Sequence, residues 1–388
     1  MTEHSEKDVQ EMLMAKDLKK IIIKEELSKQ IVGEEKSIDT ILTCCLGSKV
    51  DNAKLTSFNL LVNDESGSGK DWVVSHVLKI FPKEAWEHRT RISPTALTYW
   101  HNAKFEPTWN WNGKVLYLED PSNSVLNSPV VKLMASSGSK TVITVKPGVS
   151  IEYESKGKPV ILTTMARSSP NEENIRRFNI LNLDSGIDQT ESIMDRQIEL
   201  AKTGQSSEYD SLITACMGYL ERKPVILPFL DNKKVKKMMP KTLIMRTQLD
   251  RFLDYIKAQT ILNQLQRKYI PHLQEFQDEP EYLIGTKEDW NNAIEPFMKT
   301  VTNPLFIPLT KNDQKLLNIV ENLGHEFHYV SDIEEKVTFY GKTWLYNRLR
   351  WLAESGFLEQ NKIEKGESDK KVFAYRFIPR IKLEIKKW

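Results

Sequence analysis

Cysteine, net charge and long apolar runs are all scarce in this sequence. The three cysteines, Cys44, Cys45 and Cys216, lack the spacing of a disulfide framework or a zinc site, which favours a reducing cytosol. No apolar run approaches the ~18 residues of a membrane span. The N-terminus, MTEHSEKD, is too charged for a signal peptide. We therefore expect a cytoplasmic protein that has no membrane partner.

The formal net charge is only +2 over 388 residues. This balance neither favours nor excludes nucleic acid as a partner, so any evidence for DNA must come from local clusters. Hydrophobic residues make up 40% and charged residues 28%, which is typical of a globular protein with sizeable cores. The length allows about two or three domains.

The strongest functional pattern is the segment 59–80, NLLVNDESGSGKDWVVSHVLKI. An apolar strand, a glycine loop and an amphipathic helix from about Asp71 form a phosphate cradle, in which backbone N–H groups face the anion and Lys70 reaches the terminal phosphates. The cradle residues are Gly67, Ser68, Gly69, Lys70 and Asp71. The P-loop pattern has Gly where this chain has Asp64, and Ser or Thr where it has Asp71. The alternative is a structural Gly/Ser turn before a helix.

Two further strands bring polar residues that suit a magnesium nucleotide site. KVLYLED (114–120) predicts a strand that delivers Glu119 and Asp120 to its carboxyl end, one to hold the metal and one to polarise the attacking water. PVILTT (159–164) ends in Thr163 and Thr164, which could bond the attacking water or the γ-phosphate. Surface acids and ordinary strand-end threonines are the alternatives.

Two basic features lie near these strands. Arg176 and Arg177 precede an apolar strand, where an arginine can reach a neighbouring subunit's nucleotide, or can simply be solvated. KTVITVKPGVSIEYESK (140–156) predicts a hairpin around a Pro147-Gly148 turn. Its lysines could meet phosphates, or the hairpin could be a plain structural insertion; they are Lys140, Lys146, Lys156 and Lys158.

From about Gln30 to Asn303, the chain resembles the AAA+ replicative helicases of phages, plasmids and mobile genomic islands, which are related to the MCM-like and superfamily 3 helicases. The order and spacing of several stretches carry the resemblance: IVGEEKSIDTILTCCLG, the cradle, KIFP with RISPTALTYW (79–100), KPGVSIEY with PVILTT, ENIRRFNILNLDSGIDQT (173–190), PVILPF (224–229), IKAQTILNQLQRKYI (256–270) and IGTKEDWNNA (284–293).

The resemblance implies ATP and Mg²⁺ as cofactors and a role for each motif. Lys70 would bind the β- and γ-phosphates. Asp71 would stand where a magnesium-binding hydroxyl is expected. Glu119 and Asp120 would be the metal-binding and catalytic acids. The remaining roles are the first sensor (Thr163 or Thr164), the trans-acting arginine finger (Arg176 or Arg177), the second sensor (Arg246 or Arg251) and the DNA-gripping pre-sensor hairpin (140–156).

Residues 310–378 predict a winged helix: three helices followed by a strand, a charged turn and a strand. The third helix, KTWLYNRLRWLAESG, would enter the major groove of DNA. Its inward side would carry Leu345, Leu349 and Leu352, and the alternative use of the unit is protein contact. The predicted DNA-binding side chains on the polar side are Lys342, Thr343, Tyr346, Asn347 and Arg350.

The predicted fold class is α/β: an AAA+ P-loop ATPase core with a pre-sensor β-hairpin, a helical lid and a C-terminal winged helix. The expected domains are a helical segment (1–50), the ATPase core (51–200), a mostly helical lid (201–300), a linker (301–309) and the winged helix (310–388).

The predicted function is an ATP-dependent DNA helicase or replication initiator of a mobile element or virus. It would act as a homo-oligomeric ring, with a hexamer expected, single-stranded DNA in the channel and duplex at the winged helix. The alternatives are a non-hydrolysing or ATP-switched DNA-binding protein, and a helicase loader that remodels a partner.

Overall fold

The computed structural model of the chain divides into two compact units. The first holds residues 1–230, 250–303 and 387–388, and the second holds residues 231–249 and 304–386. The structure describes residues 4–64, 67–90, 92–94, 96–99, 108–136, 140–146, 149–166, 177–184, 186–204, 209–240, 245–270, 281–301, 311–324, 326–337, 341–354, 357–365, 368–377 and 385–388. The predicted linker at 301–309 therefore lies outside the described residues, except for Val301.

A five-stranded parallel sheet forms the centre of the first unit, as the sequence predicts. The inner strands and β7 are mainly apolar and buried, the pattern of a parallel sheet covered by helices, whereas the edge strand β2 (WEHR) is only partly buried. The spatial order is β2-β3-β6-β1-β7. The strands are β1 (Leu60–Asp64), β2 (Trp86–Arg89), β3 (Val115–Leu118), β6 (Val160–Ala166) and β7 (Asn179–Leu181).

Because all five strands run the same way, their carboxyl ends meet at one edge of the sheet. The register aligns Leu118 of β3 with Thr163 of β6, and Val62 of β1 with Thr164. β6 runs two residues beyond the predicted end at Thr164. Both threonines thus lie inside β6; Thr163 is level with the end of β3, whereas β1 continues to Asp64, opposite Ala166.

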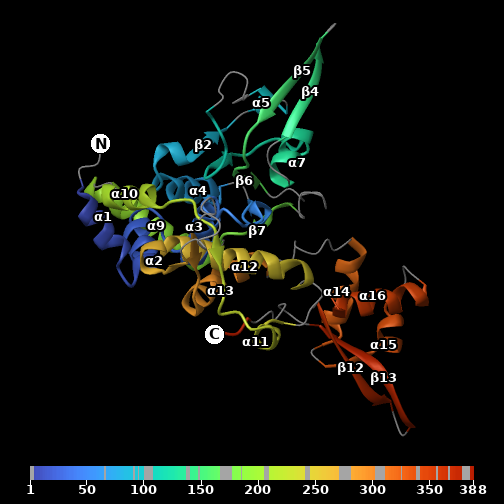
Figure 1. The fold of residues 1–388 in the computed structure, drawn as a ribbon. Coiled ribbons are helices and arrows are strands. Elements are labelled where there is room, and N and C mark those ends of the chain that lie inside the picture. The colour runs from blue at the N-terminus through green and yellow to red at the C-terminus, as the bar shows by residue number, and fades with distance from the viewer. Residues whose placement is uncertain are drawn as a thin grey trace. The chain divides into compact units, whose positions relative to one another are not determined.

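Helices and short helical turns connect the strands of this sheet or precede it (Figure 1). The N-terminal region is helical, as predicted, and includes a π-helical segment, η1. The elements before and between the strands are α1 (Glu6–Leu13), α2 (Leu18–Lys20), η1 (Ile21–Glu26), η2 (Leu27–Lys29), α3 (Glu35–Gly47), η3 (Leu55–Ser57), α4 (Lys70–Lys79), η4 (Lys83–Ala85), α5 (Ala96–Tyr99), α6 (Asn123–Leu126) and α7 (Pro129–Ser136).

The predicted hairpin is confirmed as a separate two-stranded antiparallel sheet. β4 (Lys140–Lys146) pairs with β5 (Val149–Ser155) over their full length, and Figure 1 shows the pair extending out from the first unit. The turn residues Pro147 and Gly148 lie outside the described residues, as do the side chains of both strands. Lys156, just after β5, is exposed.

Lys158 is buried, which corrects its grouping with the hairpin lysines as a side chain that could meet phosphates. Its ammonium group donates to the carbonyls of Ala135 (3.4 Å) and Ser136 (3.5 Å) at the end of α7. Burial lowers the pKa of Lys158 to about 8. The side chain therefore serves the C-terminus of α7 and is not available to bind phosphate.

The predicted lid region contains helices, but it also contains a second small sheet that the sequence analysis did not foresee. β8 (Val225–Ile226), β10 (Tyr282–Ile284) and β9 (Tyr269–Ile270) form this sheet in that order. The helical elements are α9 (Ile187–Thr203), α10 (Ser211–Tyr219), α12 (Met245–Leu262, within this unit from Asp250), η5 (Gln264–Gln266) and α13 (Lys287–Val301).

A buried ion pair fixes the start of α13 to the end of α12. Arg267 donates to both carboxylate oxygens of Asp289, at 2.9 and 2.6 Å, and Asp289 is fully buried. Asp289 also accepts the backbone N–H of Thr286, at 2.9 Å, just before the start of α13. Removing one partner of such a pair is strongly destabilising.

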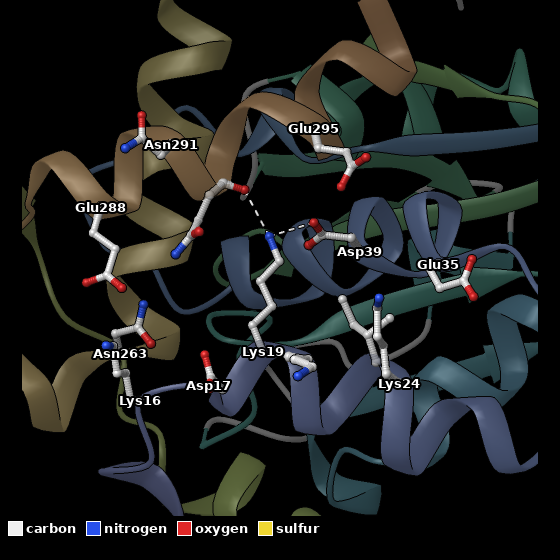
Figure 2. A pocket seen from close by; sticks show the side chains of 13 residues that line it. Lys16, Asp17, Lys19, Lys24, Glu35, Asp39, Asn263, Glu288, Asn291 and Glu295 are labelled. Atoms are coloured by element: carbon white, nitrogen blue, oxygen red, sulfur yellow. Dashed lines mark hydrogen bonds and ion pairs between the residues drawn. The ribbon is translucent and has the colours of Figure 1, made fainter. Parts of the chain in front are cut away.

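The first unit also encloses a polar cavity of about 320 Å³ between the N-terminal helices and α13. At its wall, Lys19 bridges Asp39 of α3, at 2.5 Å, and the backbone carbonyl of Asn292, at 2.9 Å (Figure 2). Burial raises the pKa of the Asp39 carboxyl to about 6, although Lys19 partly opposes the shift. None of the described residues of the glycine loop lines this cavity.

All three cysteines are buried and free. Burial raises the pKa of the Cys44 thiol to about 12 and that of Cys216 to about 11, and it raises the pKa of Cys45 as well. Buried thiols of this kind are chemically inert. Among the described residues, no helix combines the length and the apolarity needed to cross a membrane.

The second unit contains a three-helix cluster and a three-stranded sheet of order β11-β13-β12. Leu345, Leu349 and Leu352 are buried in its core, as predicted. The guanidinium group of Arg348 donates to both carboxylate oxygens of Asp313, which is fully buried. The elements are α11 (Asn232–Met238), α14 (Lys311–Asn322), β11 (His328–Tyr329), α15 (Val330–Glu334), α16 (Lys342–Glu354), β12 (Leu358–Lys365) and β13 (Ser368–Phe377).

Candidate nucleotide site

The glycine loop joins the end of β1 to the start of α4, at the carboxyl edge of the parallel sheet. Gly67 and Gly69 have φ values of +86° and +79°, which side chains other than glycine rarely adopt. Lys70 is the first residue of α4 and is 5% exposed. The loop therefore turns its backbone toward a helix N-terminus, the arrangement that binds phosphate. Glu65 and Ser66 lie outside the described residues.

Two hydroxyl groups near this edge lack a hydrogen-bond partner among the described residues. They belong to Ser68 in the loop and Thr163 on β6, and both oxygen atoms are buried. A buried hydroxyl without a partner costs free energy unless a ligand satisfies it. These two atoms are what a bound nucleotide phosphate, or water around it, would satisfy.

Asp64 stands where the P-loop pattern has Gly, and its carboxylate has a backbone partner beyond β7. It is the last residue of β1, is buried, and accepts the backbone N–H of Leu183 beyond β7, at 3.2 Å. The carboxylate has a structural use as a link between β1 and the segment after β7.

Asp71 ends a chain of hydrogen bonds that crosses the carboxyl edge. The Asp120 N–H donates to Thr164 Oγ1 (3.2 Å), and Tyr117 Oη lies 3.4 Å from Thr164 Oγ1 and donates to Asp71 Oδ1 (3.1 Å). Burial raises the pKa of Tyr117, so its hydroxyl stays protonated as the donor. The chain connects the loop helix, the acid strand and the threonine strand.

Glu119 follows β3 and is held by β2. His88 Nε2 lies 2.6 Å from Glu119 Oε2, and the His88 ring stacks on Tyr117 with centroids 4.7 Å apart. The next residue, Asp120, is exposed and has a left-handed backbone with φ +42°. A non-glycine residue in that region is uncommon and turns the backbone sharply. The two acids consequently leave the strand in different directions.

The sequence analysis did not identify Tyr117 or His88. A tyrosine in the apolar run of the acid strand, and a histidine in a neighbouring strand, are the signals that could have found them. Their roles depend on β2, β3 and β6 being adjacent, which is visible only once the strand order is known.

The two arginine candidates with described side chains lie away from this edge. Arg177 precedes β7, and its Nε donates to Ser136 Oγ, at 2.6 Å. Arg251 donates to Asn179 at the amino end of β7, at 3.0 Å. Arg251 thus contacts the edge of the sheet opposite the glycine loop, and its role as the second sensor stays a prediction. Arg176 and the side chain of Arg246 lie outside the described residues.

A magnesium ion that accompanies a nucleotide needs only one or two protein carboxylates, because phosphates and water complete its shell. Asp71 and Glu119 supply oxygen atoms of this type next to the loop, so the residues fit Mg²⁺ with a nucleotide. Within the described parts of the chain, no cluster of three or more His, Cys, Asp or Glu side chains is placed to hold a metal.

A family model matches the N-terminal part of the chain. Residues 3–215 match the family described as the MTBMA_p00010 P-loop domain. This range includes the glycine loop, the whole parallel sheet and the hairpin. No curated protein matches the sequence. A P-loop domain binds nucleotide phosphates, which indicates an NTPase-type protein with an α/β fold. The chain belongs to the MTBMA_p00010 P-loop domain family.

Proposed function

We propose that this protein is an ATP-dependent DNA helicase or replication initiator of a mobile genetic element or virus, with an AAA+ core that acts as a ring of identical subunits, a hexamer. The observation that carries the proposal is the position of β6. It lies between the loop strand β1 and the acid strand β3, and the β4–β5 hairpin enters the chain just before it.

At the nucleotide site, each side chain then has a role. Lys70 binds the β- and γ-phosphates, and Asp71 and Glu119 hold the metal. When bound, Mg²⁺ neutralises charge on the phosphates and aligns them. Asp120 orients the attacking water, and Thr163, whose hydroxyl has no partner among the described residues, bonds to that water or to the γ-phosphate.

In a ring, one subunit can supply an arginine to the nucleotide of its neighbour. Arg177 lies at the amino edge of the sheet, opposite the loop of its own subunit. Arg176 or Arg177 therefore acts on the nucleotide of a neighbour, where an arginine finger stabilises charge in the transition state. The hairpin lysines Lys140, Lys146 and Lys156 grip single-stranded DNA in the channel.

The second unit is proposed to be a winged helix that binds duplex DNA. Its order of helix, strand, two helices and two strands, with β11 paired to β13, supports this assignment. Five side chains on one side of α16 are exposed, as a recognition helix requires. They are Lys342, Thr343, Tyr346, Asn347 and Arg350.

ATP hydrolysis with and without DNA tests the enzyme proposal. We expect DNA-stimulated turnover that Lys70→Ala abolishes, with Lys79→Ala, an exposed lysine on the same helix, as the matched control. A strand-displacement assay with 3′ and 5′ tails then tests for helicase activity. Wild-type turnover no higher than that of Lys70→Ala, with any DNA, contradicts the proposal.

A second candidate is a DNA-binding protein that ATP switches without hydrolysis. The observation that favours it is that both metal-binding carboxylates already have protein partners, Tyr117 for Asp71 and His88 for Glu119. In that case ATP would bind and promote assembly on DNA, but no phosphate would be released. Nucleotide binding without turnover distinguishes this candidate from the helicase.

A further inference from the structure

Trp72 is a large aromatic side chain that is exposed beside the glycine loop. It lies in the first turn of α4, two residues after Lys70, and is 53% exposed. Tryptophan is highly buried on average, so an indole ring left open to solvent at this position calls for a binding partner. The functional roles proposed above for the loop and its neighbours do not use it.

The indole ring of Trp72 is held at one edge and on one face. Its Nε1 donates to the backbone carbonyl of Gln30, at 3.0 Å. The ring of His76, one turn further along α4, packs against it with centroids 3.9 Å apart. His76 is itself held, because Nδ1 lies 2.8 Å from the Trp72 carbonyl and Nε2 lies 3.4 Å from Lys79 Nζ. The indole is therefore preorganised, and its exposed part can bind a ligand at little cost in entropy.

The segment 30–34, which includes the partner of the indole, lies beside the chain that follows β7. Gln189 donates to the backbone carbonyl of Val32, at 2.6 Å, and the Asp184 N–H donates to the carboxylate of Glu34. Trp72 is thus directed toward the β7 side of the loop.

Asp71, the residue before Trp72, is directed the other way. It accepts the hydrogen bond of Tyr117 on β3, at 3.1 Å. In the strand order β2-β3-β6-β1-β7, the strands β3 and β7 lie on opposite sides of the loop strand β1. Two consecutive residues of α4 therefore point to the two sides of the strand that leads into the loop.

A nucleotide bound across the end of β1 extends from one of these sides to the other. Its terminal phosphate belongs on the β3 side, near Glu119 and Thr163, whose buried hydroxyl lacks a partner among the described residues. The loop and the start of α4 hold the phosphates in between. The base is at the other end of the molecule and therefore lies on the β7 side, where Trp72 is exposed.

We propose that Trp72 is the platform on which the base of the bound nucleotide stacks. This inference rests on the proposed nucleotide site and adds the part of that site that holds the base. Every nucleobase has a π face that can stack on an aromatic side chain, and stacking strength sets the preference among bases. Because purines have the larger ring system, the platform favours purine over pyrimidine nucleotides.

Isothermal titration calorimetry of the full chain with ADP and with inorganic pyrophosphate tests the platform. Both probes carry two linked phosphates, but only ADP has a base. Trp72→Ala is expected to weaken ADP binding about tenfold in Kd and to leave the Kd for pyrophosphate within about twofold. Met14→Ala is the control and should change neither, since Met14 follows α1 and is 55% exposed, much as Trp72 is.

The two probes also separate failure of this inference from failure of the nucleotide site. If wild type binds both probes and Trp72→Ala binds ADP equally well, the platform is wrong and the phosphate site stands. An equal loss of both probes in Trp72→Ala also overturns the platform, because the substitution has then disturbed the loop. A wild type that binds neither probe contradicts the nucleotide site itself, and the platform with it.

CDP, which has a pyrimidine base, tests whether stacking is the cause. Wild type should bind ADP more tightly than CDP, and the ratio of the two Kd values should fall toward one in Trp72→Ala. Trp72→Phe keeps a flat ring and should retain most of the preference. Circular dichroism checks that each variant is folded. A purine preference that persists in Trp72→Ala shows that other residues recognise the base, and this result contradicts the proposal.

Discussion

His88 on β2 holds Glu119 after β3, with 2.6 Å between His88 Nε2 and Glu119 Oε2. If Glu119 works on the metal or the attacking water, His88 is a positioning residue. His88→Ala is then expected to lower kcat for ATP about tenfold, because a hydrogen bond to a charged group is worth about 1.5–3 kcal/mol. Nucleotide affinity should stay within about twofold.

Steady-state kinetics and a fluorescent-nucleotide titration check this prediction together. His88→Gln, which keeps a donor group, should recover part of the loss. A purely structural role for His88 would instead lower the stability of the fold and would leave the kcat of the folded fraction unchanged.

Asp71 replaces the hydroxyl residue of the usual P-loop and should bind Mg²⁺ more strongly than a neutral group does. Asp71→Asn is expected to raise the Mg²⁺ concentration needed for half-maximal nucleotide binding about tenfold, equivalent to about 1.4 kcal/mol. Titration of binding with Mg²⁺ measures it, and the exposed Glu84→Gln serves as control. If the only role of Asp71 is to accept the hydrogen bond from Tyr117, Asp71→Asn and Tyr117→Phe will need the same Mg²⁺ concentration for half-maximal nucleotide binding.

Asp39 should make stability depend on pH. Burial raises the pKa of its carboxyl from 3.8 to about 6 in the folded state. A raised pKa contributes stability that is complete below about pH 4 and is lost as pH rises through about 6. Relative to Asp39→Asn, the wild type should therefore lose on the order of 3 kcal/mol between pH 4 and 7.

Urea denaturation at several pH values measures this difference. Glu35→Gln, an exposed acid that lines the same cavity, is the control and should follow the wild type. A difference between wild type and Asp39→Asn that does not change with pH would show that Lys19 keeps the carboxylate ionised throughout.

Substitutions of two arginines of α16 should have different effects, one on stability and the other on DNA binding. Arg348 is paired with the buried Asp313, so Arg348→Ala should destabilise the second unit by about 3–5 kcal/mol. Arg350 is exposed, so Arg350→Ala should change stability by less than about 0.5 kcal/mol. If α16 binds DNA, Arg350→Ala weakens duplex binding and lowers the slope of log Kd against log salt by about one.

Thermal denaturation and fluorescence anisotropy at several salt concentrations separate the two effects. Unchanged DNA affinity in Arg350→Ala, with the fold intact, favours the protein-contact use of the second unit.

The sequence predicted those parts of the fold that depend on local pattern. The glycine loop after β1 and the hairpin of β4 and β5 were foreseen because φ > 0 glycines and alternating strands have clear signals. β8, β9 and β10 were missed, because strands of two or three residues have no periodicity to detect. β1 and β6 end later than the apolar pattern indicates. Asp64 is polar and Met165 is flexible, but both are buried within these strands.

The candidate site was predicted residue by residue but not as a network. Glu119 and Thr163 were singled out from strand ends, and Lys70 from the glycine loop before a helix. The contribution of Tyr117 and His88 depends on which strands are neighbours, and that is a property of the folded sheet. The position of Arg251 at the amino edge could not be predicted for the same reason, because its partner Asn179 is 72 residues away in sequence.

The burial of Cys44, Cys45 and Cys216 has a practical consequence. The chain contains no other cysteine, and each of the three thiols has a raised pKa. Thiol-directed dyes and spin labels will therefore react slowly with the folded wild-type protein. A single cysteine introduced at an exposed position becomes the preferred attachment point, so distances within an assembly become measurable without first replacing the native cysteines.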